Sequence, residues 1–152
     1  MDVGQPTALN ERLRQAGLRA TQPRLAVYHA LESLGGHRSA DEVYDRILSS
    51  KQRLSRASVY NALAALSAAG LILSADAGPG PALYETATEW HHHAVCRICR
   101  EVSDVACVTG SKPCLSTGQA WGEIDEAQII FRGVCTTCSQ GAAGIRAHPR
   151  RD

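Results

Sequence analysis

Cysteine and histidine residues gather in two short segments of the second half of the chain, and both residue types bind metal ions. The first segment, 91–99, carries three consecutive histidines and then two cysteines separated by two residues. The second segment, 135–138, carries another cysteine pair at the same spacing. Thiolates suit zinc, whereas imidazoles suit zinc, iron, nickel and copper. The two ligand types therefore predict two kinds of metal site.

The two cysteine pairs together predict one closed site. A spacing of two residues lets both sulfurs of a pair reach the same ion at about 2.3 Å, and four sulfurs complete a tetrahedron. A site without an open position is structural. The alternative is that one pair is a redox dithiol, but two pairs in one short module favour zinc. The predicted zinc ligands are Cys96, Cys99, Cys135 and Cys138.

Two of the three histidines predict a second, more open site. On an extended strand His91 and His93 point to one face, and His92 points to the other. Two histidines do not complete a metal site, so carboxylates must supplement them. Glu85 and Asp104 are the candidates. The alternative is that these histidines are ordinary surface residues.

Three further residues could join this chemistry. His37 by its position predicts only a loop histidine. Cys107 and Cys114 remain after the two pairs are assigned, and they fit small structural hydrophobes or redox thiols.

Four helices and a hairpin are predicted for the first half of the chain. Ser39 and Ser55 are expected to cap the third and fourth helices, and the apolar stripe of the third is expected to include Leu48. Two short strands, 71–73 and 82–85, follow around a Gly/Pro-rich turn. This order predicts a winged helix-turn-helix, whose fourth helix would enter the major groove of DNA.

The second half of the chain is predicted to contain three strands, at 93–96, 101–108 and 127–134. We also expect a turn or short helix at 112–117 and a frayed tail from Ser139. A unit of about 55 residues with few large side chains buries little apolar surface. It therefore needs a metal, a partner subunit, or both to stabilise it.

The bulk composition sets broad limits. The chain has 152 residues, a net charge of +1 and six cysteines. We expect a cytoplasmic protein that does not enter a membrane, because the sequence has neither a signal-peptide pattern at its start nor an apolar run of about 20 residues. In such a protein the cysteines are metal ligands or redox thiols. The stretch 46–75 has four basic and no acidic residues, which fits either a DNA-binding face or a solvated helix face.

In combination these motifs resemble the Fur family of metal-dependent repressors, from about Leu9 to Cys138. The resemblance rests on four segments, 17–24, 55–63, 91–99 and 133–138. It implies a mixed α/β (α+β) fold and a homodimer that binds an inverted-repeat operator in double-stranded DNA. The implied domains are a winged-helix DNA-binding domain (1–85, with the wing turn and hinge at about 76–90), a metal-binding dimerisation domain (86–140) and a flexible tail (141–152).

The resemblance also assigns site residues. The structural zinc falls on the four paired cysteines. The regulatory Fe²⁺ or Mn²⁺ falls on His37, Glu85, His91, His93 and Asp104. This assignment explains His37 as the ligand that ties the DNA-binding half to the sensor half. The candidate DNA contacts are Arg56, Ser58, Tyr60 and Asn61 at the start of the fourth helix, and Arg19 at phosphate or in the minor groove.

Within the family, Asp104 is typical of PerR-type peroxide sensors, and segment 104–115 resembles the actinobacterial FurA/CatR group, which represses catalase genes. Glu85 departs from the PerR pattern, which has aspartate there. Iron, zinc and nickel uptake regulators and a thiol-based repressor therefore remain alternatives. A second sensory site is expected to be absent, because Trp90 and Ala127 replace two of its ligands.

Two further classes are open. A metalloenzyme could use histidines and carboxylates to activate water, but the helix-turn-helix would then have no role, so we predict that the chain is not an enzyme. A zinc-binding interaction module would leave His37 unexplained.

Overall fold

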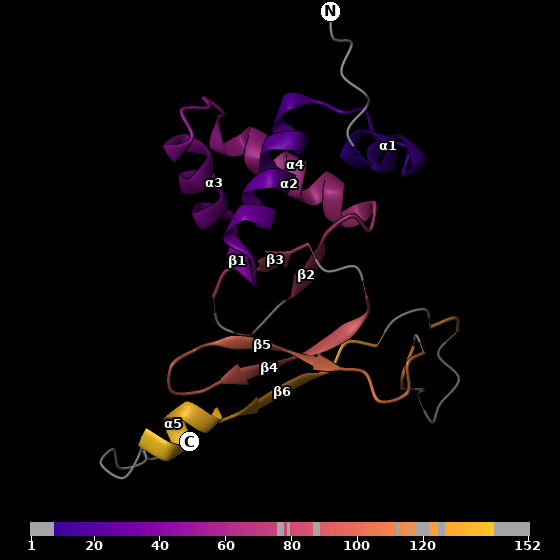
Figure 1. Cartoon of the computed structure of the whole chain (residues 1–152). Helices are drawn as coiled ribbons and strands as arrows, with labels where there is room; N and C mark the ends of the chain where they lie inside the picture. The colour runs from indigo at the N-terminus through magenta and orange to yellow at the C-terminus, as the bar shows by residue number, and fades with distance from the viewer. Residues whose placement is uncertain are drawn as a thin grey trace, which may run out of the picture. The chain divides into compact units, whose positions relative to one another are not determined.

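The computed structural model describes residues 8–75, 78, 80–86, 89–111, 113–115, 117, 122–124 and 127–141. They form two compact units, and the chain passes from the first to the second between Glu89 and Trp90. Helices dominate the first unit and a three-stranded sheet dominates the second (Figure 1). None of the helices in these ranges is both long and apolar enough to cross a membrane.

The helices of the first unit begin where their caps predict. Ser39 forms the expected capping box, accepting from the backbone N–H of Glu42 at 3.3 Å while its own N–H donates to the Glu42 carboxylate at 2.8 Å. The Ser55 hydroxyl accepts from the N–H of Ser58 at 3.1 Å. Thr21 occupies the cap position of the second helix without a side-chain hydrogen bond. The helices are α1 (Ala8–Gln15), α2 (Gln22–Leu34), α3 (Ala40–Ser49) and α4 (Arg56–Ala68).

One apolar core joins these four helices. Leu13 of α1, Leu31 of α2, Val43 of α3 and Leu63 of α4 are all fully buried in it. The prediction that Leu48 belongs to the buried stripe of α3 is wrong, because its side chain is 43% exposed. It follows Ile47 by about 100° around the helix and so lies beside the buried face.

A small antiparallel sheet completes the first unit, in the order β1 (Arg38–Ser39), β3 (Leu83–Glu85), β2 (Leu73–Ala75). The strand predicted at 71–73 begins only at Leu73, because Leu71 and Ile72 are buried in the helical core. The strand β1 falls in a segment for which no strand was predicted. Residues 76, 77 and 79 of the predicted turn lie outside the described residues.

The second unit is built on β4 (His91–Cys96), the middle strand of a sheet. It pairs antiparallel with β5 (Val102–Ala106) and parallel with β6 (Ile130–Gly133), as Figure 1 shows. Helix α5 (Thr136–Gly141) follows β6. The prediction of a frayed tail from Ser139 is therefore wrong for residues 139–141, which are helical. Residues 142–152 lie outside the described residues. So do Lys112 and Ser116 of the turn predicted at 112–117.

Candidate metal centres and nucleic-acid interface

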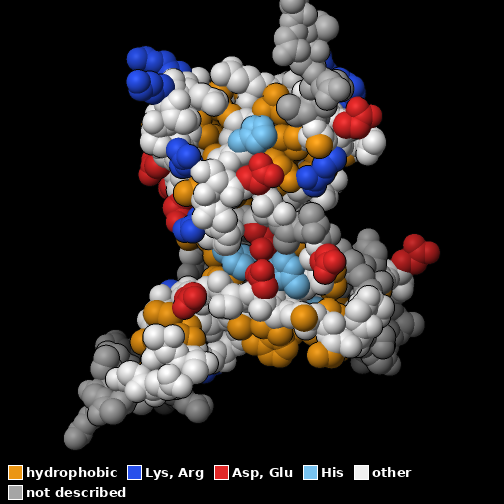
Figure 2. Space-filling view, viewed as in Figure 1, with side chains coloured by type: hydrophobic (Ala, Val, Ile, Leu, Met, Phe, Trp, Pro, Cys, Tyr) orange, Lys and Arg blue, Asp and Glu red, His pale blue; other side chains and the backbone are white. Residues whose placement is uncertain are grey.

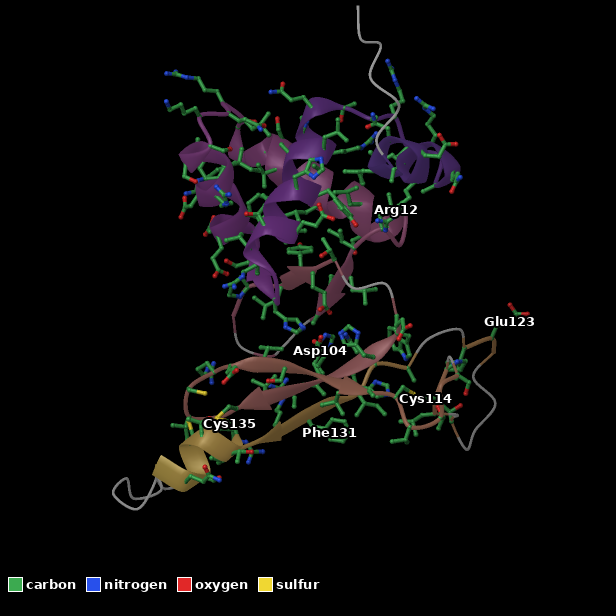
Figure 3. All side chains as sticks on the ribbon, in the orientation of Figure 1. Arg12, Asp104, Cys114, Glu123, Phe131 and Cys135 are labelled. Carbon is green, nitrogen blue, oxygen red and sulfur yellow. The ribbon has the colours of Figure 1, made fainter. Side chains whose placement is uncertain are left out.

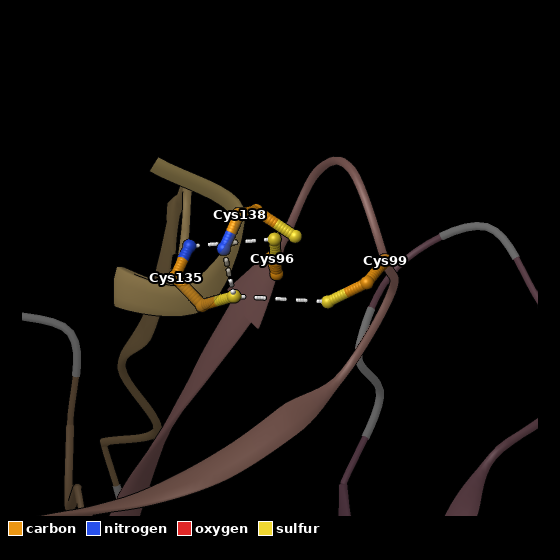
Figure 4. Close-up of side chains that lie close together, drawn as sticks. All are labelled: Cys96, Cys99, Cys135 and Cys138. Atoms are coloured by element: carbon orange, nitrogen blue, oxygen red, sulfur yellow. Dashed lines mark hydrogen bonds between the residues drawn. The ribbon is translucent and has the colours of Figure 1, made fainter. Parts of the chain in front are cut away.

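The four paired cysteines lie together at one end of the second unit (Figure 4). The parallel register of β4 and β6 sets Cys96 opposite Gly133, so the second pair follows immediately at the start of α5. The Sγ atoms of Cys99 and Cys135 are 3.8 Å apart, and all four sulfurs lie within 4.8 Å of one another. The sequence prediction that these cysteines share one site agrees with this geometry.

Sulfur spacing and ionisation both suit a divalent cation. A tetrahedron with bonds of about 2.3 Å has edges of about 3.8 Å, which is the Cys99–Cys135 separation. The backbone N–H of Cys135, donating to the Cys96 sulfur at 3.4 Å, lowers the pKa of Cys96 to about 6. The hydrogen bond with the Cys135 side chain raises the pKa of Cys138 to about 12. The Cys138 thiol thus resists ionising unless a cation such as zinc balances the charge of the neighbouring thiolates.

An imidazole–carboxylate pair lies on the sheet of the first unit. His37 immediately precedes β1 and Glu85 ends β3, and these strands pair Arg38 with Tyr84. The pairing brings His37 Nε2 to 3.4 Å from Glu85 Oε1. A nitrogen and an oxygen donor at this separation could serve one transition-metal ion, although two donors do not complete its coordination.

A matching pair lies on the sheet of the second unit. The antiparallel register sets His93 opposite Asp104, whose side chain is labelled on β5 in Figure 3. His91 Nε2 lies 3.4 Å from Asp104 Oδ1, and the rings of His91 and His93 have centroids 4.8 Å apart. The predicted alternation of the histidines is therefore confirmed, and this face of β4 offers two imidazoles and one carboxylate.

The opposite face of β4 carries a cluster that the sequence analysis did not assemble. The ligand atoms of His92, Cys107 and Cys114 lie within 4.8 Å of one another. The neighbourhood of His92 and Cys107 follows from strand alternation. His92 pairs with Val105, and Cys107, two residues after Val105, points to the same side of the sheet. The position of Cys114, labelled in Figure 3, depends on the path of the chain after β5, for which the sequence offers no periodic pattern.

The start of α4 presents polar side chains to solvent, as predicted for a DNA-reading helix. Tyr60 is 49% exposed and Asn61 is exposed, whereas Ser58 is half-buried with its hydroxyl 2.9 Å from that of Ser55. Arg19 is exposed and its carbonyl accepts from Arg24. Figure 2 shows Lys and Arg side chains around the surface of the helical unit.

The candidate Arg56 differs from the others because it already has partners within its own unit. Its guanidinium forms an ion pair with Asp41 and stacks over the ring of Tyr44, 4.5 Å from the centroid. These contacts hold the start of α4 against α3. A contact from Arg56 to DNA would therefore either share the guanidinium, which has five N–H donors, with the Asp41 carboxylate or displace that carboxylate.

Replacement of Cys138 by serine is expected to remove about one zinc ion per chain, because three thiolates leave an open position that serine fills poorly. The second unit should then be cleaved faster in limited proteolysis. Zinc content by mass spectrometry measures the loss, and Ser139→Ala, a neighbouring change on the same helix, is the control. Equal zinc contents in the two variants would contradict the assignment.

The sequence and fold have clear relatives. Residues 15–110 match the model of the "Ferric uptake regulator family". The transcriptional regulator FurA of Mycobacterium tuberculosis is 39% identical over 143 residues, covering 91% of this chain and 95% of that protein. The peroxide operon regulator of Bacillus subtilis is 27% identical over 142 residues, covering 86% of this chain and 90% of that protein.

A solved structure, the ferric uptake regulator of Pseudomonas aeruginosa with manganese, superposes with a TM-score of 0.68 at 27% identity. The match covers 86% of this chain and 99% of that one. The predicted fold class, a winged helix-turn-helix unit followed by a small α/β unit, is thereby confirmed. The chain belongs to the ferric uptake regulator family, whose members are metal-dependent transcriptional regulators and not enzymes.

Proposed function

We propose that this chain is a metal-dependent repressor that leaves its operator when hydrogen peroxide oxidises a metal-bound histidine. The observation that carries the proposal is the pair of imidazole–carboxylate sets, one on each unit: His37 with Glu85, and His91 and His93 with Asp104. Each set is incomplete as a metal site by itself. One ion that takes ligands from both would join the DNA-binding unit to the second unit.

The donor chemistry fits Fe²⁺ or Mn²⁺. All five donors are nitrogen or oxygen atoms, and imidazole and carboxylate together suit these ions better than thiolates do. The four cysteines, by contrast, fit a structural Zn²⁺ in a closed site. Distinct donor sets would let the two metals occupy separate positions without competing.

The regulatory metal acts by binding one arrangement of the two units better than others. A ligand can shift a conformational equilibrium only by its difference in affinity for the two states. Loss of one histidine donor therefore weakens the arrangement that binds DNA. Fe²⁺ held by these residues would supply the reactivity toward peroxide; one peroxide oxygen would be added to the ring of His37 or His91, and the other would leave as water.

Helix α4 is the proposed DNA-reading element. The ring of Tyr60 can contact a thymine methyl group, and the amide of Asn61 can pair with adenine. Ser58 and Arg56 are candidates for further contacts, and Arg19 for a phosphate or minor-groove contact. The exposure of Tyr60 and Asn61 supports this assignment, since neither belongs to the apolar core.

The second unit is the proposed homodimer interface. Phe131 of β6, labelled in Figure 3, and Val134, which directly follows β6, are each 50% exposed. They line an open groove of about 200 Å³ together with Val95. A two-fold dimer would cover such an apolar face and present two copies of α4 to an inverted-repeat operator. Figure 2 shows apolar side chains, coloured orange, at the surface of this unit.

The proposed targets are catalase and other oxidative-stress genes, and the repressor would act on them in the cytoplasm. The likeness to FurA and to a peroxide operon regulator supports this branch. The alternatives are uptake regulators for iron, zinc or nickel and a repressor that senses peroxide through cysteine thiols. The same experiment separates all of them.

Operator binding should require a regulatory metal, with affinity about 5- to 150-fold higher when it is present. We expect peroxide to abolish binding of the Fe²⁺ form and to spare the Mn²⁺ form. Fluorescence anisotropy measures the affinity, and mass spectrometry of peptides should show one added oxygen on His37 or His91.

His29→Ala, which alters an exposed histidine of α2, is the matched control for His37→Ala. Only His37→Ala should lose the dependence of operator binding on the regulatory metal. Release by peroxide without histidine oxidation would contradict the proposal in favour of thiol sensing. Binding that does not respond to peroxide would favour an uptake regulator, for iron if the Fe²⁺ form binds the operator and for zinc or nickel if only those ions support binding.

Loss of Asn61 and loss of Arg19 should have different signatures on DNA. Asn61→Ala should weaken the free energy of operator binding by about 1–3 kcal/mol and relax base preference at one operator position, because a base contact is removed. Arg19→Ala should weaken binding to all sequences and lower its salt dependence, because a phosphate contact is removed. Binding to a panel of single-base operator variants at several salt concentrations distinguishes the two. Identical profiles for both variants would be inconsistent with these roles.

A further inference from the structure

The cluster of His92, Cys107 and Cys114 is not used by the proposed regulatory site or by the four-cysteine site. His92 projects from β4 to the face opposite His91 and His93, and its Nε2 lies 3.4 Å from the sulfur of Cys114. Cys107 directly follows β5. The three ligand atoms lie within 4.8 Å of one another, and all three residues belong to the second unit.

The surroundings hold the imidazole in place. His92 is 4% exposed, and the ring of Trp90 meets it edge-on with centroids 5.9 Å apart. Its Nδ1 is buried without a hydrogen-bond partner among the described residues. Among the described residues, the His92 ring therefore has its polar contact at Nε2, with the sulfur of Cys114. Both cysteines are half-buried and neither is in a disulfide.

The donor set has a definite metal preference. Two sulfurs and one imidazole nitrogen favour a thiophilic cation and disfavour the hard ions that bind through oxygen. Zinc accepts three protein ligands with a fourth position open to water or to another donor. Sulfur–sulfur and sulfur–nitrogen separations below 4.8 Å allow one ion to reach all three atoms after small rotations of the side chains.

We propose that His92, Cys107 and Cys114 form a third metal site, which binds Zn²⁺ through one imidazole nitrogen and two thiolates. Binding releases the two thiol protons to solvent. The ion would fasten the chain beyond β5 to the central strand of the sheet. This site is independent of the proposed peroxide response, because it shares no ligand with the regulatory set.

Cobalt substitution tests the site in the full chain. The protein is kept reduced with a phosphine and loaded with one zinc ion in the four-cysteine site, and Co²⁺ is then added to saturation. We expect thiolate-to-cobalt charge-transfer absorption and tetrahedral d–d bands. The proposed regulatory site contains no sulfur, so cobalt bound there does not produce the charge-transfer bands.

The double variant Cys107→Ser/Cys114→Ser should lose these bands and about one equivalent of zinc-binding capacity. His92→Ala should weaken them, whereas His29→Ala and His37→Ala should leave them unchanged. Retained zinc in the four-cysteine site and an unchanged circular dichroism spectrum check that each variant folds.

Two results would overturn the proposal. One is a charge-transfer spectrum that is the same in the wild type and in the double variant. The other is a reduced wild type that binds no cobalt through sulfur but is recovered with a Cys107–Cys114 disulfide when it is purified without reductant. The pair would then be a redox couple and not a metal site.

Discussion

The register of β4 against its two neighbours determines where the candidate metal ligands of the second unit lie. Pairing with β5 sets Asp104 opposite His93, and pairing with β6 sets Gly133 opposite Cys96, which brings the second cysteine pair to the first. A slip of one residue would turn the histidines to the wrong face and shift the sulfurs by about 3.3 Å. The two pairings of one strand thus position nitrogen and oxygen donors along its length and sulfur donors at its end.

This arrangement separates metals by ligand chemistry. The closed set of four sulfurs fits an ion that stays bound, because no position is open for exchange. The set that includes His91 and His93 is open and, in the proposed function, is completed only by His37 and Glu85 of the other unit. Stability and sensing would then depend on neighbouring but chemically distinct sites. A small unit with few buried large side chains gains most from the first of these.

Local rules allowed much of this to be predicted. The cap at Ser39 depends on residues within one turn, and the division of the histidine run into two faces depends only on the alternation of a strand. The errors arose where tertiary packing decides. Leu48 lies just off the buried face, Ile72 joins the helical core in place of a strand, and the position of Cys114 depends on a path without periodicity. Local patterns in a single sequence do not indicate which distant residues will pack together.

The proposed function depends on one metal ion that takes ligands from both units. X-ray absorption at the manganese edge tests it most directly, in protein that holds zinc in the four-cysteine site and manganese in the regulatory site. We expect a manganese shell of nitrogen and oxygen donors without sulfur, and the loss of one imidazole contribution in His37→Ala. A shell that contains sulfur, or one that is unchanged in His37→Ala, would contradict it.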